Sequence, residues 1–175
     1  MTVTHDGDDR GLRFGRLVCE HQDAVLRTCF LYLCDRTMAE DASQETFLRA
    51  WRALDTFRGE SSEKTWLMKI AARVCYDMNR SAWFRMINRR VTPDMLPEPA
   101  ADADSRDEAL TLAVMRLPRR LREAVVLYYY QGMTVVEIAD ALSISHAAVS
   151  GRLKRGRERL KTMMKGDEQD ARSQQ

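Results

Sequence analysis

The sequence predicts an all-α fold of two small helical domains joined by an acidic, proline-rich linker. Glycine and proline are scarce, with 8 and 4 copies in 175 residues, whereas long stretches are rich in Ala, Leu, Arg and Glu, which favour helices. Apolar residues recur at the spacing typical of the buried face of a helix. Three of the four prolines fall within residues 91–107 and exclude a regular helix there.

Charge is distributed in blocks that match this division. Residues 64–90 hold seven Lys or Arg and one Asp, residues 91–110 hold one Arg and six acids, and residues 145–165 hold seven Lys or Arg and one Glu. Two basic blocks around an acidic one indicate two anchor points on a polyanion, although each block alone is also typical of a solvated helix face. We expect a flexible N-terminus (1–11), a first domain (12–90), a linker (91–108), a second domain (109–165) and a disordered tail (166–175).

Composition excludes several classes of protein. No run of about 18 apolar residues is present and the N-terminus is polar and acidic, so we expect no membrane insertion, no signal peptide and a cytoplasmic location. The four cysteines lack Cys-x-x-Cys spacing and the three histidines are scattered, which favours reduced thiols and no metal or other cofactor. The sequence has no phosphate-binding glycine loop and no nucleophile beside a base, so it does not indicate an enzyme.

Two helices open the first domain. Apolar residues at helical spacing predict the first over residues 12–34. The second covers residues 37–54, with Thr37 as its N-cap and Glu40 three residues later to complete a capping box.

The second helix has a polar face that includes one leucine. The members of this face are Asp41, Gln44, Glu45, Leu48, Arg49 and Arg52. Leu48 is either one of the single exposed leucines common on protein surfaces, or the anchor of a docking surface with charges as its rim.

A third helix follows, with Ser61 or Ser62 as its N-cap, and runs to about residue 80. Apolar residues from Leu67 to Met78 form its core face. The opposite face alternates cations and rings within roughly 80° of arc, and consists of Trp66, Lys69, Arg73, Tyr76 and Arg80. Cations bind phosphates and rings stack on unpaired bases, so this face suits single-stranded nucleic acid. The alternative is an amphipathic surface on which arginine stems cover the rings.

The second domain begins with a pair of helices. Residues 112–117 precede Pro118, which suits the first turn of a helix. Leu121 and Tyr128 are expected on the apolar face of that helix, and Gly132 ends it.

A helix-turn-helix is predicted next. Thr134 caps a short helix over residues 135–142, with Glu137 at capping-box distance, and Ser145 caps a longer helix to about residue 163. Ser143 stands in the turn, where glycine is frequent. Small residues near the start of the longer helix allow close approach to base edges, and cations farther along reach phosphates or guanine. Other short helix pairs produce the same pattern, so DNA binding is the favoured interpretation rather than the sole one.

Two sets of motifs resemble regions of bacterial sigma factors. Three segments resemble region 2: Asp41-Ala-Ser-Gln-Glu-Thr-Phe-Leu-Arg-Ala-Trp51, Phe57-Arg-Gly-Glu-Ser-Ser62 and Trp66-Leu-Met-Lys-Ile-Ala71. Region 4 is resembled by Leu117-Pro118, residues 133–142 and Val149-Ser-Gly-Arg-Leu-Lys-Arg-Gly-Arg-Glu-Arg-Leu160. The order and the short linker match the extracytoplasmic-function group of the sigma-70 family. The resemblance covers about residues 12–165 and implies a transcription-initiation factor that catalyses nothing by itself.

The resemblance implies three sets of binding residues. It places one face on the β′ clamp helices of core RNA polymerase, through Asp41, Gln44, Glu45, Leu48, Arg49 and Arg52. It implies binding of the melted −10 promoter element by Arg58, Lys64, Trp66, Lys69, Arg73, Tyr76 and Arg80. It implies binding of the −35 duplex, in a domain that also sits on the β flap, by Ser145, His146, Ala147, Ser150, Gly151, Arg152, Lys154, Arg155 and Arg157.

The resemblance also implies an anti-sigma partner, and a linker that threads toward the cleft of the polymerase. The linker by itself fixes no relative placement of the two domains. Glu63, Arg73 and the Ser150-Gly151 pair depart from the family's usual pattern, so the promoter sequence is not predicted. The main alternative is a dimeric helix-turn-helix regulator, which leaves the ringed face of the third helix and the Leu48 face without a purpose.

Overall fold

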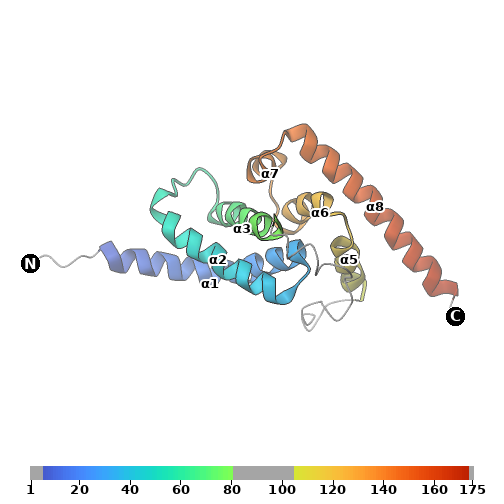
Figure 1. Cartoon of the computed structure of the whole chain (residues 1–175), viewed down its shortest axis with the longest axis horizontal. Coiled ribbons are helices and arrows are strands. Elements are labelled where there is room, and N and C mark those ends of the chain that lie inside the picture. Colours follow the sequence, from blue (N-terminus) through green and yellow to red (C-terminus); the bar gives the residue numbers. More distant parts are fainter. Residues whose placement is uncertain (1–5, 81–104, 174–175) are drawn as a thin grey trace, which may run out of the picture.

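The computed structural model describes residues 6–80 and 105–173, with side chains from 9 to 80 and from 108 to 165. All regular structure in these ranges is helical, which confirms the expected all-α class (Figure 1). The N-terminal bundle consists of α1 (Asp6–Leu33), α2 (Arg36–Ala53), the short turn η1 (Leu54–Thr56) and α3 (Glu63–Arg80). The C-terminal bundle consists of α5 (Ser105–Met115), α6 (Arg119–Val125), the turn η3 (Val126–Tyr130), α7 (Val135–Leu142) and α8 (His146–Ser173).

Two helices are longer than the sequence predicted. α1 begins at Asp6, so residues 6–11, which we expected to be flexible, are helical. Arg10 explains this extension: its guanidinium lies 4.2 Å from the centre of the Trp51 ring, donates to the Trp51 carbonyl at 2.8 Å and pairs with Asp55 at 3.2 Å. α8 continues through the expected tail to Ser173, since this stretch has no proline to end it.

The cap of α2 differs from the expected one. Asp35, rather than Thr37, is the N-cap: its carboxylate accepts from the Met38 backbone N–H at 2.8 Å. Cys34 ends the preceding helix with a left-handed backbone, φ 54°, so the chain turns early and Thr37 already lies inside α2. The cap of α3 is one of the two expected serines, because Ser62 Oγ accepts from the Thr65 backbone N–H at 3.0 Å.

The core of the N-terminal bundle lies between α1, α2 and α3. Leu17 and Val25 of α1 are fully buried, and so are Leu67 and Val74, which lie on the core face predicted for α3. α2 contributes mainly small side chains, Ala39, Ala42, Thr46 and Ala50. Small residues let α2 approach its neighbours closely, and they leave its larger polar side chains facing outward.

The C-terminal bundle contains the predicted helix-turn-helix. Thr134 caps α7, and both hydrogen bonds of its capping box with Glu137 are present. Ser143 ends α7 with φ 53° and ψ 49°, the left-handed conformation in which glycine is frequent. Val149 and Leu153 of α8 are buried.

One prediction for this bundle was wrong. The residues of η3 form a π-helical turn, which carries one extra residue per turn and shifts every following side chain around the axis. Tyr128, expected on the apolar face, is therefore exposed together with Tyr129, and the two ring centroids lie 4.9 Å apart.

The two bundles pack directly against each other. Arg122 of α6 is buried and donates to the carbonyls of Met115 and Tyr32, the latter at 2.9 Å. The Tyr32 hydroxyl, in turn, donates to the Glu123 carbonyl at 3.4 Å. α7 packs on α3, and the buried cluster runs through both bundles. The relative placement that the linker did not predict is thus set by the interface, while residues 81–104 lie outside the described part of the chain.

Gly156 provides a test of the α6–α8 packing. A Cβ added at Gly156 would lie 2.7 Å from Val125 Cγ2 of α6, closer than packed carbon atoms approach. We expect Gly156→Ala to lower the free energy of unfolding by about 1–3 kcal/mol, measured by urea denaturation followed by circular dichroism.

Gly151, one turn earlier in α8, is the matched control. A Cβ there would meet the Arg155 guanidinium at 3.4 Å, the far end of a flexible side chain. Alanine also favours a helix over glycine by roughly 0.5–1 kcal/mol, so Gly151→Ala should leave stability unchanged or slightly raised. Equal losses in both variants would contradict the close approach at Gly156.

Candidate nucleic-acid and polymerase interfaces

α3 brings the predicted cations and rings onto one face. Trp66 and Lys69 are half-buried, whereas Arg73, Tyr76 and Arg80 are exposed. The Arg73 guanidinium lies 5.6 Å from the centre of the Tyr76 ring, so a cation and a ring are held together on this surface. The face is therefore partly the stacked surface we considered as the alternative, yet 42% of Tyr76 stays open to solvent.

The loop before α3 forms an open pocket of about 470 Å³ next to this face. Trp66 and Lys69 line it from α3, and Arg58 lines it from the loop. The Trp66 ring packs against Phe57, with centroids 5.0 Å apart and planes tilted by 37°. Rings, two cations and the acid Glu60 thus line a cavity that is large enough for a nucleic acid base, which offers a flat face and a nearby phosphate.

α2 presents the predicted polar face on a different side of the N-terminal bundle. Asp41, Gln44 and Arg52 are exposed, and Glu45 and Arg49 are half-buried. Leu48 is 52% exposed in their midst. An exposed large apolar side chain ringed by charges has the composition of a small protein-docking surface.

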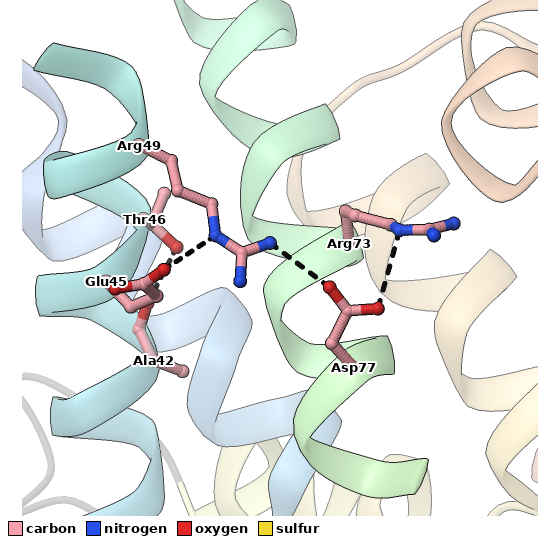
Figure 2. A network of polar contacts seen from close by, with 6 residues as sticks. All are labelled: Ala42, Glu45, Thr46, Arg49, Arg73 and Asp77. Carbon is pink, nitrogen blue, oxygen red and sulfur yellow. Dashed lines mark hydrogen bonds and ion pairs between the residues drawn. The ribbon is translucent and has the colours of Figure 1, made fainter. Parts of the chain in front are cut away.

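A network of ion pairs connects the α2 face to the α3 face. Figure 2 shows Arg49 between Glu45, at 2.7 Å, and Asp77 of α3, at 3.1 Å, while Asp77 also pairs with Arg73 at 3.4 Å. The hydrogen bond with Glu45 is the main reason that the pKa of Arg49 is raised. Arg49 and Arg73, predicted to bind different partners, are therefore held by one shared carboxylate.

The start of α8 presents most of the predicted −35 residues to solvent. Ser145 caps the helix, as expected, because its hydroxyl accepts from the Ala148 backbone N–H at 3.2 Å. Gly151 is half-buried. Exposed side chains on this helix include those of His146, Ala147, Ser150, Lys154, Arg155 and Arg157.

Arg152 does not share this exposed surface. Its side chain is 16% exposed and lies 3.8 Å from the buried carboxylate of Glu123, which also pairs with Arg119 at 2.6 Å. Arg152 therefore faces the core of the C-terminal bundle, where it balances the Glu123 charge.

The exposed tyrosines of η3 were not predicted. The Tyr129 hydroxyl lies 3.4 Å from Arg157 of α8, and this contact raises the pKa of the Arg157 guanidinium. Their exposure follows from the π-helical turn, for which the run of three tyrosines is not a recognised sequence signal.

One cluster of possible metal ligands occurs among the described residues. Glu20, His21 and Glu63 place ligand atoms within 4.8 Å of one another. Glu63, however, pairs with Arg13 at 3.8 Å and with Arg16 at 3.5 Å. Its charge is already balanced by two guanidinium groups, so we assign no metal to the cluster.

Comparison with known proteins identifies the family. The family model described as Sigma-70 region 2 matches residues 17–85, and the one described as Sigma-70, region 4 matches residues 107–160. The ECF RNA polymerase sigma factor SigX of Bacillus subtilis is 31% identical over 82% of this chain and 79% of its own length. SigW of the same organism is 27% identical over 87% of this chain and 89% of its length.

Solved structures show the same fold. The sigma factor RpoE of Bartonella quintana, in complex with the anti-sigma factor NepR, aligns with a TM-score of 0.74 at 22% identity, over 87% of this chain and 97% of RpoE. CnrH, in complex with the cytosolic domain of CnrY, aligns with a TM-score of 0.62 at 27% identity, over 88% of each chain.

The chain belongs to the extracytoplasmic-function group of the sigma-70 family. It is an RNA polymerase sigma factor, a promoter-recognising initiation factor rather than an enzyme, and its partners are core polymerase and promoter DNA. Among the residues that the structure describes, no helix is long and apolar enough to span a membrane.

The capping box of α7 should make the stability of the protein depend on pH. The hydrogen bond from the Thr134 backbone N–H is the main reason that the pKa of Glu137 is lowered from its ordinary value of 4.5. A carboxyl whose pKa is lowered by folding stabilises the fold above that ordinary value, and the contribution is lost as the pH falls through the folded pKa. We expect Glu137→Gln to destabilise the protein at neutral pH, and the difference from wild type to shrink at an acidic pH below that ordinary value.

Urea denaturation at both pH values measures this difference. Glu158→Gln, which changes an exposed acid on α8, is the control and should show no such convergence. A Glu137→Gln deficit that stays constant with pH would contradict the role of the charged form.

Proposed function

We propose that this sigma factor docks on core polymerase through the α2 face, captures the melted −10 element on α3 and reads the −35 duplex with the start of α8. The observation that carries the proposal is the α3 face with its adjoining pocket. Duplex DNA hides its base faces, so a surface that combines rings, cations and a base-sized cavity is most useful once the strands are apart.

Strand capture uses two kinds of contact. Tyr76, and Trp66 at the pocket, offer ring surfaces, each worth about 1–3 kcal/mol per stacked base. Cations around them bind the backbone: Arg58, Lys64, Lys69, Arg73 and Arg80. Because the phosphate contacts release counterions, promoter binding should weaken steeply with salt.

Polymerase docking uses the Leu48 surface. The proposed target is the pair of β′ clamp helices, with Leu48 as the apolar anchor and Asp41, Gln44 and Arg52 as the exposed rim. Glu45 and Arg49, which form an ion pair with each other, also belong to this surface. The C-terminal bundle is proposed to sit on the β flap.

Reading of the −35 element uses the start of α8 in the major groove. Ala147, Ser150 and Gly151 are small, so the helix can approach base edges closely, while Ser145 and His146 lie at its tip. Lys154, Arg155 and Arg157 are placed to contact phosphates. Arg152, which faces Glu123, is proposed to orient α8 rather than to touch DNA.

Regulation is proposed to involve an anti-sigma factor. RpoE and CnrH are both solved in complexes, with the anti-sigma factor NepR and with CnrY, and both share this fold. We place the action of the chain beside RNA polymerase in the cytoplasm. The division into a first domain up to residue 90, a linker over 91–108 and a second domain from residue 109 belongs to the same proposal.

Run-off transcription tests the proposal directly. Core polymerase, with and without the protein, is supplied with a library of randomised promoters. Transcripts that depend on the protein and share two spaced elements would support it. If the protein shifted duplex DNA alone and neither bound core polymerase nor directed a start, the dimeric-regulator alternative would replace it.

A charge placed at Leu48 should weaken docking. Leu48→Glu puts a carboxylate where the apolar anchor is needed, so we expect core affinity to fall at least about tenfold, as for a central interface residue. Fluorescence anisotropy with labelled protein and core polymerase measures the affinity. Leu26→Glu, at another exposed leucine on α1, is the control and should bind core as wild type does.

Removal of the Tyr76 ring should weaken capture of the melted strand. With the holoenzyme and a pre-melted promoter from the library, we expect Tyr76→Ala to lower affinity by roughly 5- to 150-fold, the range for one lost stacking contact. Tyr129→Ala is the matched control, because it removes an exposed ring outside this face. Equal affinities for wild type and Tyr76→Ala would remove Tyr76 from the strand site.

A further inference from the structure

Exposed apolar side chains recur on α1 every seven residues. Leu12 is 69% exposed, Cys19 is exposed and Leu26 is 38% exposed. Seven residues make nearly two turns of an α-helix, so the three side chains lie within about 40° of arc on one face. The next position of the repeat, Leu33, is fully buried. The exposed repeat therefore covers residues 12–26 and has the spacing of a short seam between two helices.

Gly15 lies beside this seam, in the first half of α1, which forms the lower edge of the N-terminal bundle in Figure 1. Glycine weakens the interior of a helix relative to alanine, yet a Cβ added at Gly15 would have no neighbour within 4 Å. Packing among the described residues thus gives no reason for a glycine here. The missing side chain does allow the backbone of a second helix to approach closely.

The charges of α1 flank the seam on one side. Between residues 9 and 27, helical geometry places every charged side chain to the same side of the line from Leu12 to Leu26. The four charged residues nearest the seam are all exposed, and they alternate in sign along the helix: Asp9, Arg16, Asp23 and Arg27. The other side of the seam carries no charge.

Two copies of α1 can pair about a two-fold axis at Cys19. Leu12 and Leu26 lie seven residues to either side of Cys19. In an antiparallel pair, Leu12 of each copy therefore meets Leu26 of the other copy, and the two Cys19 side chains meet at the axis. The surface is self-complementary, as a two-fold interface requires.

The charges favour the antiparallel direction over the parallel one. A two-fold axis perpendicular to the helices brings the same flank of both copies together. Arg16 then lies opposite Asp23 of the second copy, and Arg27 lies near Asp9 of the second copy, so opposite charges meet across the pair. A parallel pair would place the charged flank of each helix against the uncharged flank of the other.

We propose that two copies of the free sigma factor associate through the outer face of α1, in an antiparallel pair centred on Cys19. The inference goes beyond the proposed promoter and polymerase contacts, because it uses no residue of α2, α3 or α8. Two leucines and one cysteine per copy form a small interface, of the weak class that buries less than about 1,200 Å² in total. The pair is therefore expected at high protein concentration and is lost on dilution, so core binding measured with dilute protein is independent of it.

Thiol crosslinking tests the contact, because Cys19 is exposed whereas the other three cysteines are buried. Diamide, which takes two electrons and two protons from a pair of thiols, is applied to the full-length protein, and non-reducing electrophoresis follows the covalent dimer. Cys19→Ser should form none. Leu12→Glu and Leu26→Glu keep the thiol but place a carboxylate in the seam, so the dimer should form at least about tenfold more slowly.

Leu48→Glu is the matched control for crosslinking. It makes the same change at an exposed leucine of α2, outside the seam, and should form the covalent dimer at the wild-type rate. Equal rates in all three leucine variants would overturn the proposal, since random collisions of an exposed thiol would then explain the dimer. Absence of a covalent dimer in the wild type would overturn it as well.

An exchange of charges tests the direction of the pair. Arg16→Glu and Asp23→Arg each place like charges opposite one another, so each should weaken association by about two- to tenfold, measured by sedimentation equilibrium. The double variant restores opposite charges and should associate as wild type does. Residues 16 and 23 of one chain lie about 10 Å apart along the helix, so this recovery cannot come from a contact within α1.

Net charge is controlled by a second double variant. Arg16→Glu combined with Asp41→Arg, at an exposed acid of α2, has the same net charge and also loses the Arg16–Glu63 ion pair, but it should stay weak. Recovery in the first double variant and not in the second supports the antiparallel pair. Equal association of the two double variants would overturn it.

Discussion

A buried guanidinium lies at the interface that joins the two bundles of this sigma factor. Arg122 of α6 donates to the carbonyl of Tyr32, near the C-terminus of α1, and to that of Met115, the last residue of α5. Helix C-termini carry partial negative charge, so both acceptors stabilise the buried cation, and the neighbouring Glu123 carboxylate is balanced by Arg119 and Arg152. At the same interface, α7 packs over α3.

Local features of the fold could be predicted from the sequence because they depend on neighbours along the chain. The Ser62 cap and the Thr134 capping box are contacts between residues three apart in the sequence, and both are present. The core face of α3 follows from the repeat of apolar residues every three or four positions, and it is buried. The cap of α2 was predicted at Thr37, two residues late, because the left-handed Cys34 that ends α1 has no side-chain signature. The end of a helix could not be predicted where the backbone conformation, rather than the type of residue, determines it.

Long-range features could not be predicted in the same way. In the sequence, Arg152 is one more cation on a basic helix. The structure shows that it lies beside Glu123, 29 residues earlier in the chain. The π-helical turn that exposes Tyr128 and Tyr129 likewise has no local motif that marks it in the sequence. The linker sequence does not predict the interface between the bundles. The residues that form this interface have the patterns of ordinary core and surface positions.

The ion-pair network between α2 and α3 connects the proposed docking face on α2 with the proposed strand-binding face on α3. Melting a promoter requires several base-stacking steps to be broken, each on the order of 1–2 kcal/mol, and stacking on protein rings offsets only part of that sum. The balance has to come from polymerase, so the strand-binding face must be held in fixed relation to the docking face. The buried core shared by α2 and α3 supplies that relation, and Asp77, which pairs with Arg49 and with Arg73, connects the two faces at the surface. Under the proposed roles of the two faces, a rigid bundle would let energy from polymerase docking be used in strand capture.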